Sequence, residues 1–542
     1  MEAASTLTED RYVRQDGATH KQWTMAQAVR EAYARGEEDE ALQPLVLVDP
    51  EGQPVGRIRD GDYVIFYDIR GEREIELTRS FVDQDFYEFP VDKGLKAHFA
   101  TMIQYDENLG ARVAFPPLQE IDHTLSQVIS ESGLRQAKIT ESEKAIHLQY
   151  FLNGKVDRPF PGEQRIVVPS PRVDDYTLVP EMNVAGVTEA VLGKIADPSC
   201  DVIFANFVNV DVVGHIENEE AIRQAVEAVD SHIGQVVEVA QQEGVTTVIT
   251  ADHGTVEKWL YPDGAVDTGH TDSPVPFILI APDRFTLRDE GALPDVAPTL
   301  LQLLGIPRPN EMTGVSLLQH SPLDTAKRHR VLLLIVDGWG FREEEYGNLI
   351  AQARTPTMDR LWRQHPSTTL EASGKAVGMP EGTVGNSEAG HLHLGAGRRI
   401  PSDRLRIEEA LEDGSFFENE AFLWAIRGAK RDRTRLHLLG IVSFYSSHGS
   451  VDHLLALLEM AKREGLEDVY IHSMLGRRGE HPESGARYIE QVEEAADQLG
   501  VGRLVSVIGR FWSLDREENW DRVEKSYRWL VYGQGRPVRE VS

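Results

Sequence analysis

The chain has 542 residues, of which 41% are hydrophobic and 27% are charged, values that are ordinary for a globular protein of two or more domains. Its formal net charge of −32 argues against nucleic acid or an anionic membrane as a partner, and no apolar run approaches the ~20 residues needed to span a bilayer. The single cysteine, Cys200, excludes an internal disulfide, and the opening MEAASTLTED is unlike a secretory signal, so we expect a cytoplasmic protein.

Short apolar runs alternate with helical patterns along the chain, which predicts an α/β fold. The segment GDYVIFYDIRGER (61–73) reads as a strand that runs into an arginine-bearing loop. Apolar residues at a helical period predict a helix over 220–243. Further buried strands are predicted in 201–211, 246–254, 276–282 and 331–336.

Three of these predicted strands end in residue types that bind metal ions. They supply Asp211, the pair Asp252 and His253, and Asp337. Sites in open α/β sheets lie beyond the carboxyl ends of the strands, so these side chains are expected to meet at one edge. One such aspartate is usually a cap or turn residue. Three together predict a metal site.

Other residues with suitable chemistry lie near these strands. His215 follows Asp211 by four residues, so one turn of helix or a compact loop can direct both at one ion. His270 lies in the polar loop TGHTDSPVPF, and Ser387 lies between glycines in GNSEAGH, where backbone can approach a ligand closely. Nitrogen and oxygen donors without a thiolate suit Mn²⁺, Mg²⁺ or Zn²⁺. Two such ions can clamp a phosphoryl group and activate a serine, which predicts transfer through a phosphoserine.

Five motifs together resemble those of the cofactor-independent (2,3-bisphosphoglycerate-independent) phosphoglycerate mutases of the alkaline phosphatase superfamily: DGWG, GKAVGMPEGTVGNSEAGH, NVDVVGH, ADHG and TGHT. In that family DGWG lies near the amino terminus and ADHG near the carboxyl terminus, whereas here the order is reversed. EMTGVSLL (311–318) resembles the family's carboxyl terminus, and a polar linker at 319–330 joins it to VLLLIVDGWG. The resemblance therefore implies a circular permutation.

The resemblance implies two α/β domains. An alkaline-phosphatase-like metal-binding domain would span 118–396, and a smaller substrate domain would be assembled from 1–117 and 397–542. The implied protein is a cytoplasmic, monomeric isomerase of glycolysis that acts on a small anionic phosphorylated substrate. It would use two divalent ions, most simply Mn²⁺, with Mg²⁺, Co²⁺ or Zn²⁺ as alternatives.

The resemblance also implies roles for individual residues. Ser387 would be the nucleophile, Lys144 would neutralise the phosphate, and His448 would contact the substrate. Guanidinium groups can hold carboxylate or phosphate through two hydrogen bonds. The arginines that match the family's substrate-binding positions are Arg70, Arg73, Arg478, Arg510 and Arg516.

The implied metal ligands fall into two sets, and all of them carry the family's residue type. The set that shares one ion consists of Asp337, Ser387, Asp252 and His253. The set that holds the other ion consists of Asp211, His215 and His270.

Two loops depart from the family's pattern. SFYSSHGS (443–450) replaces SDGGVHSH but keeps His448, and LGRRGEHP (475–482) replaces LDGRDTPP but keeps Arg478. Gly479 stands where the family has an aspartate that is a candidate for handling hydroxyl protons, and glycine cannot take a proton. Two activities therefore stay open: interconversion of 3-phosphoglycerate and 2-phosphoglycerate, or phosphatase or mutase action on another small phosphoester or phosphonate. A non-catalytic binding protein is disfavoured, because binding alone does not need the nucleophile.

Overall fold

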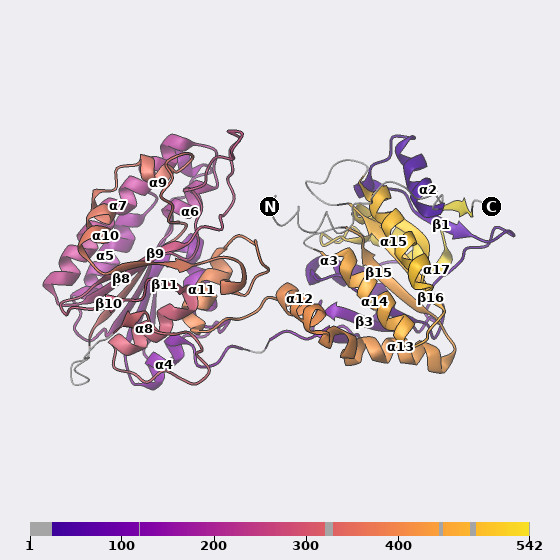
Figure 1. Ribbon diagram of the computed structural model, residues 1–542, viewed down its shortest axis with the longest axis horizontal. Helices are drawn as coiled ribbons and strands as arrows, with labels where there is room; N and C mark the ends of the chain where they lie inside the picture. Colours follow the sequence, from indigo (N-terminus) through magenta and orange to yellow (C-terminus); the bar gives the residue numbers. More distant parts are fainter. Residues whose placement is uncertain (1–23, 119, 320–328, 444–447, 477–483, 541–542) are drawn as a thin grey trace. The chain divides into compact units, whose positions relative to one another are not determined.

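The computed structural model describes residues 24–118, 120–319, 329–443, 448–476 and 484–540 (Figure 1). These residues form two compact units. The first consists of the described residues between Leu118 and Leu405, and the second of those from 24 to Pro117 and from Arg406 to 540. Among the described residues, no helix is long and apolar enough to cross a membrane.

In the described part of the first unit, an eight-stranded sheet runs in the order β11-β14-β9-β8-β13-β7-β5-β6. The strands β8, β13, β7, β5 and β6 are parallel, whereas β9 is antiparallel to β8. The bounds are β5 Gln136–Glu141, β6 Glu163–Val168, β7 Val202–Phe207, β8 Thr246–Thr250, β9 Val275–Ile280, β11 Glu290–Ala292, β13 Val331–Val336 and β14 Ser367–Glu371.

The apolar strand β13 is the structural centre of this sheet. All of its residues are buried, and it pairs in parallel with β7 on one side and β8 on the other. Helices pack around the sheet (Figure 1). The helices of this unit are α4 Leu125–Glu131, α5 Val184–Ile195, α6 Asn209–Gly214, α7 Glu219–Gln242, α8 Val296–Leu303, α9 Leu349–Gln352, α10 Pro356–Gln364 and α11 Ser387–Ala396. A small separate sheet pairs β10 Thr286–Leu287 with β12 Leu318–Gln319.

The second unit is also a sheet with helices, and its order is β18-β1-β17-β16-β15-β2-β3-β4. Strands from the two ends of the chain pair with one another in it: β1 lies between β17 and β18, and β2 pairs with β15 on one side and with β3 on the other. The strands are β1 Leu45–Val48, β2 Tyr63–Phe66, β3 His98–Ile103, β4 Arg112–Phe115, β15 Leu436–Ile441, β16 Val469–Leu475, β17 Arg503–Gly509 and β18 Arg536–Arg539.

The helices of the second unit cover this sheet (Figure 1). They are α2 Thr24–Tyr33, α3 Gly71–Val82, α13 Glu420–Asp432, α14 Val451–Arg463, α15 Gly485–Leu499, α16 Arg510–Ser513 and α17 Trp520–Tyr532. The helix α12, Asp403–Asp413, carries the chain from the first unit into the second.

The expected α/β class with two domains is confirmed, and most predicted elements have the predicted type. The helix predicted at 220–243 is α7, which begins after Asn218, whose side chain caps it by accepting from the Ala221 amide. The strand predicted at 201–211 is shorter than expected. It ends at Phe207, and Asp211 lies instead in the first turn of α6, where its amide donates to the carbonyl of Asp337 at 3.1 Å.

Candidate metal centre

Four neighbouring parallel strands of the first unit lead into side chains that converge. The strands β8, β13 and β7 lead to Asp252, Asp337 and Asp211, and β5 leads through a short helix, η2 Ser142–Lys144, to Lys144. Lys144 Nζ lies 2.6 Å from Asp211 Oδ2 and 3.0 Å from Asp337 Oδ1. The parallel arrangement is the reason for this convergence, because it places the carboxyl ends of all four strands at one edge.

Ser387 reaches the same point from the start of α11. Its Oγ lies 2.6 Å from Lys144 Nζ, 2.9 Å from His253 Nε2 and 3.5 Å from Asp337 Oδ1. Gly390, three residues later in the GNSEAGH motif, makes the approach possible, since a Cβ there would lie 2.4 Å from the carbonyl oxygen of Asp252. A side chain there would push the helix that carries Ser387 away from the end of β8.

A second set of ligand atoms gathers on the other oxygen of Asp211. His215 Nε2 lies 3.3 Å from Asp211 Oδ1, and His270 Nε2 lies 3.2 Å from the same oxygen. A hydrogen bond from the other ring nitrogen fixes the orientation of each imidazole. His215 Nδ1 donates to the carbonyl of Thr268 at 2.7 Å, and His270 Nδ1 donates to that of Gly385 at 3.0 Å. Both rings therefore present Nε2 for a ligand.

Two further residues belong to this cluster, although they are not among those predicted from the sequence. His391, one helical turn after Ser387, places Nδ1 3.2 Å from Asp252 Oδ2 and 2.9 Å from the carbonyl of Ser387. Asn206 on β7 donates to Asp337 Oδ2 at 2.9 Å. Both had a signal in the sequence: His391 shares the GNSEAGH motif at a helical spacing, and Asn206 interrupts an otherwise apolar strand.

The centre concentrates negative charge away from water. Asp211, Asp252 and Asp337 are at most 3% exposed. Burial, followed by the charge of Asp252, raises the pKa of Asp337. For Lys144, burial lowers the pKa, but the surrounding carboxylates raise it by more, so that its pKa lies above the ordinary value. The three carboxylates together carry more negative charge than the single ammonium group of Lys144 can offset.

The residues present fit divalent cations. Asp252 Oδ2 is buried without a well-directed hydrogen bond, because the nearby His391 Nδ1 donates to the Ser387 carbonyl instead. Ligand atoms lie within 4.8 Å of one another in three overlapping groups here: Asp211 with His215 and His270, Asp211 with His253 and Asp337, and Asp252 with Asp337 and His391. Such nitrogen and oxygen donors, with no thiolate among them, suit a divalent metal.

The residues expected to hold the substrate lie in the second unit, except that Arg478 falls outside the described residues. Arg70 Nη2 lies 2.5 Å and Arg516 Nη1 3.1 Å from the same oxygen of Glu72. Arg73 Nη1 donates to the carbonyl of Leu514 at 3.1 Å, two residues before Arg516. These contacts bring three of the predicted arginines into one neighbourhood.

His448 and Arg510 also belong to the second unit. His448 Nδ1 lies 2.7 Å from Glu74 Oε1, and Arg510 Nη2 lies 3.0 Å from Glu40 Oε1. Burial lowers the pKa of His448, and the charges of Arg510, Arg70 and Arg73 lower it further. The ring of His448 thus lies close to the arginine-rich part of this unit.

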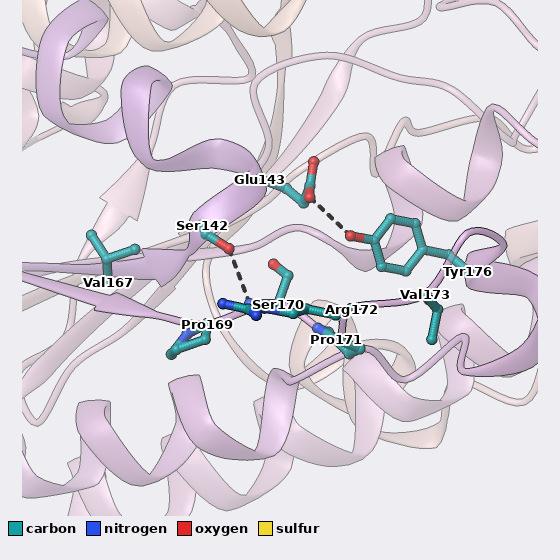
Figure 2. A pocket seen from close by; sticks show the side chains of 9 residues that line it. All are labelled: Ser142, Glu143, Val167, Pro169, Ser170, Pro171, Arg172, Val173 and Tyr176. Carbon is teal, nitrogen blue, oxygen red and sulfur yellow. Dashed lines mark hydrogen bonds between the residues drawn. The ribbon is translucent and has the colours of Figure 1, made fainter.

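A separate cavity of about 500 Å³ lies at the carboxyl ends of β5 and β6 (Figure 2). Its polar groups contact one another: Tyr176 donates to Glu143 at 2.8 Å, and the Ser170 amide donates to Ser142 Oγ at 3.0 Å. None of the predicted metal ligands lines it. The cavity is therefore distinct from the metal centre, although Glu143 directly precedes Lys144.

Comparison with protein families gives two matches. Residues 34–308 match the model described as "Metalloenzyme superfamily", and residues 407–542 match the one described as "BPG-independent PGAM N-terminus". The segment that matches an N-terminal family model is thus the last part of this chain.

Individual relatives are similar over about half of their length. A protein of Methanosarcina barkeri named "2,3-bisphosphoglycerate-independent phosphoglycerate mutase 1" is 45% identical over 292 residues, which are 54% of this chain and 56% of the relative. Proteins of the same enzyme name, without the number, are 39% identical in Methanococcoides burtonii (58% of this chain, 62% of the relative) and 43% identical in Moorella thermoacetica (56% and 58%). The chain therefore matches little more than half the length of these relatives.

One solved structure, of phosphoglycerate mutase from Leishmania mexicana at low cobalt concentration, is 30% identical and has a TM-score of 0.36. The likeness covers 51% of this chain and 53% of that one.

Proposed function

We propose that this chain, which belongs to the metalloenzyme superfamily, interconverts 3-phosphoglycerate and 2-phosphoglycerate without bisphosphoglycerate, through a phosphoserine at Ser387. The observation that carries the proposal is the position of Ser387 Oγ, which lies 2.6 Å from Lys144 Nζ and 2.9 Å from His253 Nε2. A serine hydroxyl held between a buried cation and metal-binding side chains is arranged to act as a nucleophile on a phosphoester. The names of the relatives support the choice of substrate.

We assign the metal ions to two sets of ligands. When bound, divalent ions lower the pKa of a serine hydroxyl and offset the charge of the phosphoryl oxygens. Manganese is proposed because the donors are nitrogen and oxygen, and Mg²⁺, Co²⁺ and Zn²⁺ are the alternatives. One ion would be held by Asp337, Ser387, Asp252 and His253, and the other by Asp211, His215 and His270.

The chain's own residues then carry the phosphoryl group in two transfers. The deprotonated Ser387 Oγ attacks phosphorus, the bond from phosphorus to the glycerate oxygen breaks, that oxygen takes up a proton, and the phosphoryl group rests on Ser387. Lys144 Nζ supplies positive charge beside the group that moves. The other glycerate hydroxyl then gives up its proton and attacks phosphorus, which breaks the bond to Ser387, returns the deprotonated Oγ and yields the isomer.

The second unit would hold the organic part of the substrate. Its arginines are suited to carboxylate and phosphate, and His448 would contact the glycerate. We accordingly assign the metal-binding role to 118–396 and the substrate-holding role to 1–117 with 397–542. Action as a monomer stays a prediction.

A circular permutation is part of this proposal. Three observations support it: the N-terminal family model matches at 407–542, the strand that leads to DGWG is the central β13, and strands from both ends of the chain pair within one sheet of the second unit. The alignments with the relatives cover little more than half of each protein. This agrees with a permutation, because two sequence blocks in exchanged order cannot both be matched in one continuous alignment. The proposed junction, 319–330, lies mostly outside the described residues.

The test is phosphorus NMR of the manganese-loaded protein with 3-phosphoglycerate and no bisphosphoglycerate. We expect a 2-phosphoglycerate signal that grows toward equilibrium. Free phosphate alone, or an unchanged spectrum, would overturn the mutase proposal. It would favour the second candidate, a phosphatase or mutase for another small phosphoester or phosphonate, which the glycine at position 479 supports.

Exhaustive chelation is expected to abolish turnover, and manganese is expected to restore it. The same treatment should lower the unfolding temperature, because the buried carboxylates lose their counter-ions. A ligand at 100 times its Kd stabilises by about 2.7 kcal/mol. Calorimetric scans with and without manganese, run beside the activity assay, measure both effects. Full activity after chelation, with no metal found by elemental analysis, would contradict the two-ion assignment.

A further inference from the structure

A second cluster of buried titratable side chains lies in the second unit, apart from the metal ligands. It consists of Asp68, which follows β2, Glu74 on α3, and His448, which precedes α14. All three are at most 1% exposed, and one ligand atom of each lies within 4.8 Å of the others. The main chain holds them together, since the Ile69 amide donates to the carbonyl of His448 at 2.6 Å.

The hydrogen bonds of this cluster leave one oxygen unsatisfied. Glu74 Oε1 lies 2.7 Å from His448 Nδ1, and Glu74 Oε2 accepts from the Arg73 amide at 3.1 Å. Asp68 Oδ1 accepts from the Ile441 amide at 2.8 Å, whereas Asp68 Oδ2 is buried and has no hydrogen-bond partner. Two carboxylates so close together in a dry environment cannot both stay charged, so the pair retains a proton.

The surroundings favour a proton over a metal ion in this cluster. The arginines Arg510, Arg70 and Arg73 are close to His448 and would repel a divalent cation. The hydroxyl of Tyr105 donates to the Asp68 carbonyl at 2.8 Å, and Tyr67 also borders Asp68. Both phenols have raised pKa values, with burial as the main cause, so they stay neutral.

The direction of the pKa shifts agrees with this placement of the proton. Burial raises the pKa of Glu74 to about 8 and that of Asp68 well above its ordinary range. Burial, reinforced by the arginines, lowers the pKa of His448 to about 4. At neutral pH the imidazole is therefore neutral while the carboxyl pair is protonated.

We propose that Asp68 and Glu74 store one proton, and that His448 passes it to and from the hydroxyl oxygens of the bound substrate. This inference rests on the proposed mutase function. In this proposal His448 would contact the substrate and is the catalytic residue, whereas Glu74 and Asp68 are positioning residues that act through His448. The relay would supply the proton transfer that Gly479 cannot perform.

The proton balance of the relay is closed over one turnover. As the phosphoryl group leaves the substrate oxygen, that oxygen takes the proton from His448 Nε2, and Nδ1 takes the proton of Glu74. When the other hydroxyl attacks the phosphoserine, its proton passes to Nε2, and the proton on Nδ1 returns to Glu74. No imidazolium has to persist, and the protein ends in its starting state.

The decisive variant is Glu74→Gln, which keeps the shape of the side chain but cannot move a proton. We expect mutase turnover to fall by at least about 100-fold, as for the loss of a general acid–base group. Release of nitrophenolate from 4-nitrophenyl phosphate should stay unchanged, because this leaving group needs no proton. The matched control is Glu76→Gln, a buried glutamate on the same helix with its own raised pKa, near 7, which should leave both activities unchanged.

Two further readouts separate proton transfer from a structural effect. In the wild type, turnover should fall as pH rises through about 8, because Glu74 then loses the proton that it must donate, and this fall should be absent in Glu74→Gln. Nitrogen-15 NMR of the wild-type holoenzyme should show His448 neutral at pH 7 and protonated only near pH 4. A His448 signal that titrates near its ordinary value would overturn the relay, whether or not Glu74→Gln folds.

The outcomes also separate the relay from the proposed function. Mutase activity that survives in Glu74→Gln, or an equal loss of both activities, would overturn the relay alone. A wild-type protein that shows no mutase activity would overturn the proposed function. In that case the pH at which His448 titrates still decides whether the carboxyl pair holds the proton.

Discussion

Ser387→Ala is expected to reduce turnover by about 10³-fold or more, the largest effect of any single substitution in this chain, because the phosphoryl group then has no acceptor. The hydroxyl is the point at which Lys144 and His253 meet, at 2.6 Å and 2.9 Å. Its removal costs hydrogen bonds but no carboxylate, so metal should still bind. Kinetic assays should be paired with intact mass measurements after exposure to 3-phosphoglycerate, in which only the wild type gains a phosphoryl group.

A matched control for this variant is Ser130→Ala. Ser130 belongs to the same unit and donates to the carbonyl of Pro161 at 2.7 Å on the surface. The Ser130→Ala substitution should leave turnover and the phosphorylation of the protein unchanged. Normal turnover in Ser387→Ala would contradict the phosphoserine route, and phosphorylation at another residue would move the nucleophile elsewhere.

Lys144→Met is expected to produce the second largest effect, in activity and in stability. Turnover should fall by about 100-fold or more, because a preorganised positive charge beside the moving phosphoryl group is lost. In metal-free protein the variant should also lose about 3–5 kcal/mol of stability, as expected when a buried carboxylate pair is left without its cation. Manganese should restore most of this stability, and its affinity should not fall, since Asp211 and Asp337 are freed for the ion.

Lys138→Met is the control that separates these effects. Lys138 is equally buried in the same unit, but it faces Glu163 at 3.6 Å, and burial lowers its pKa to about 7. This variant should be destabilised whether or not manganese is present. Calorimetry of both variants with and without metal measures the difference, and rescue of Lys138→Met by manganese to the same extent would contradict our assignment of Lys144 to the metal centre.

Much of the metal centre could be predicted from the sequence because its residues end regular elements. A strand such as VLLLIV in 331–336 is apolar throughout, so it had to be buried, and the acid after it had to emerge at a sheet edge. The same reasoning predicted Asp252 with His253. Asp211 is the instructive exception, because β7 ends at Phe207 and the acid reaches the centre from α6.

The sequence by itself determined the α/β class, the strands and long helix, and the residue types that gather at the centre, because periodicity and strand-end chemistry are local properties. Only the tertiary structure brought Asn206 and His391 against the carboxylates, and Asp68 and Glu74 against His448. Glu74 and His448 are separated by 374 residues. Such contacts depend on which strands become neighbours and on how burial changes each group's charge, and no local pattern carries that information.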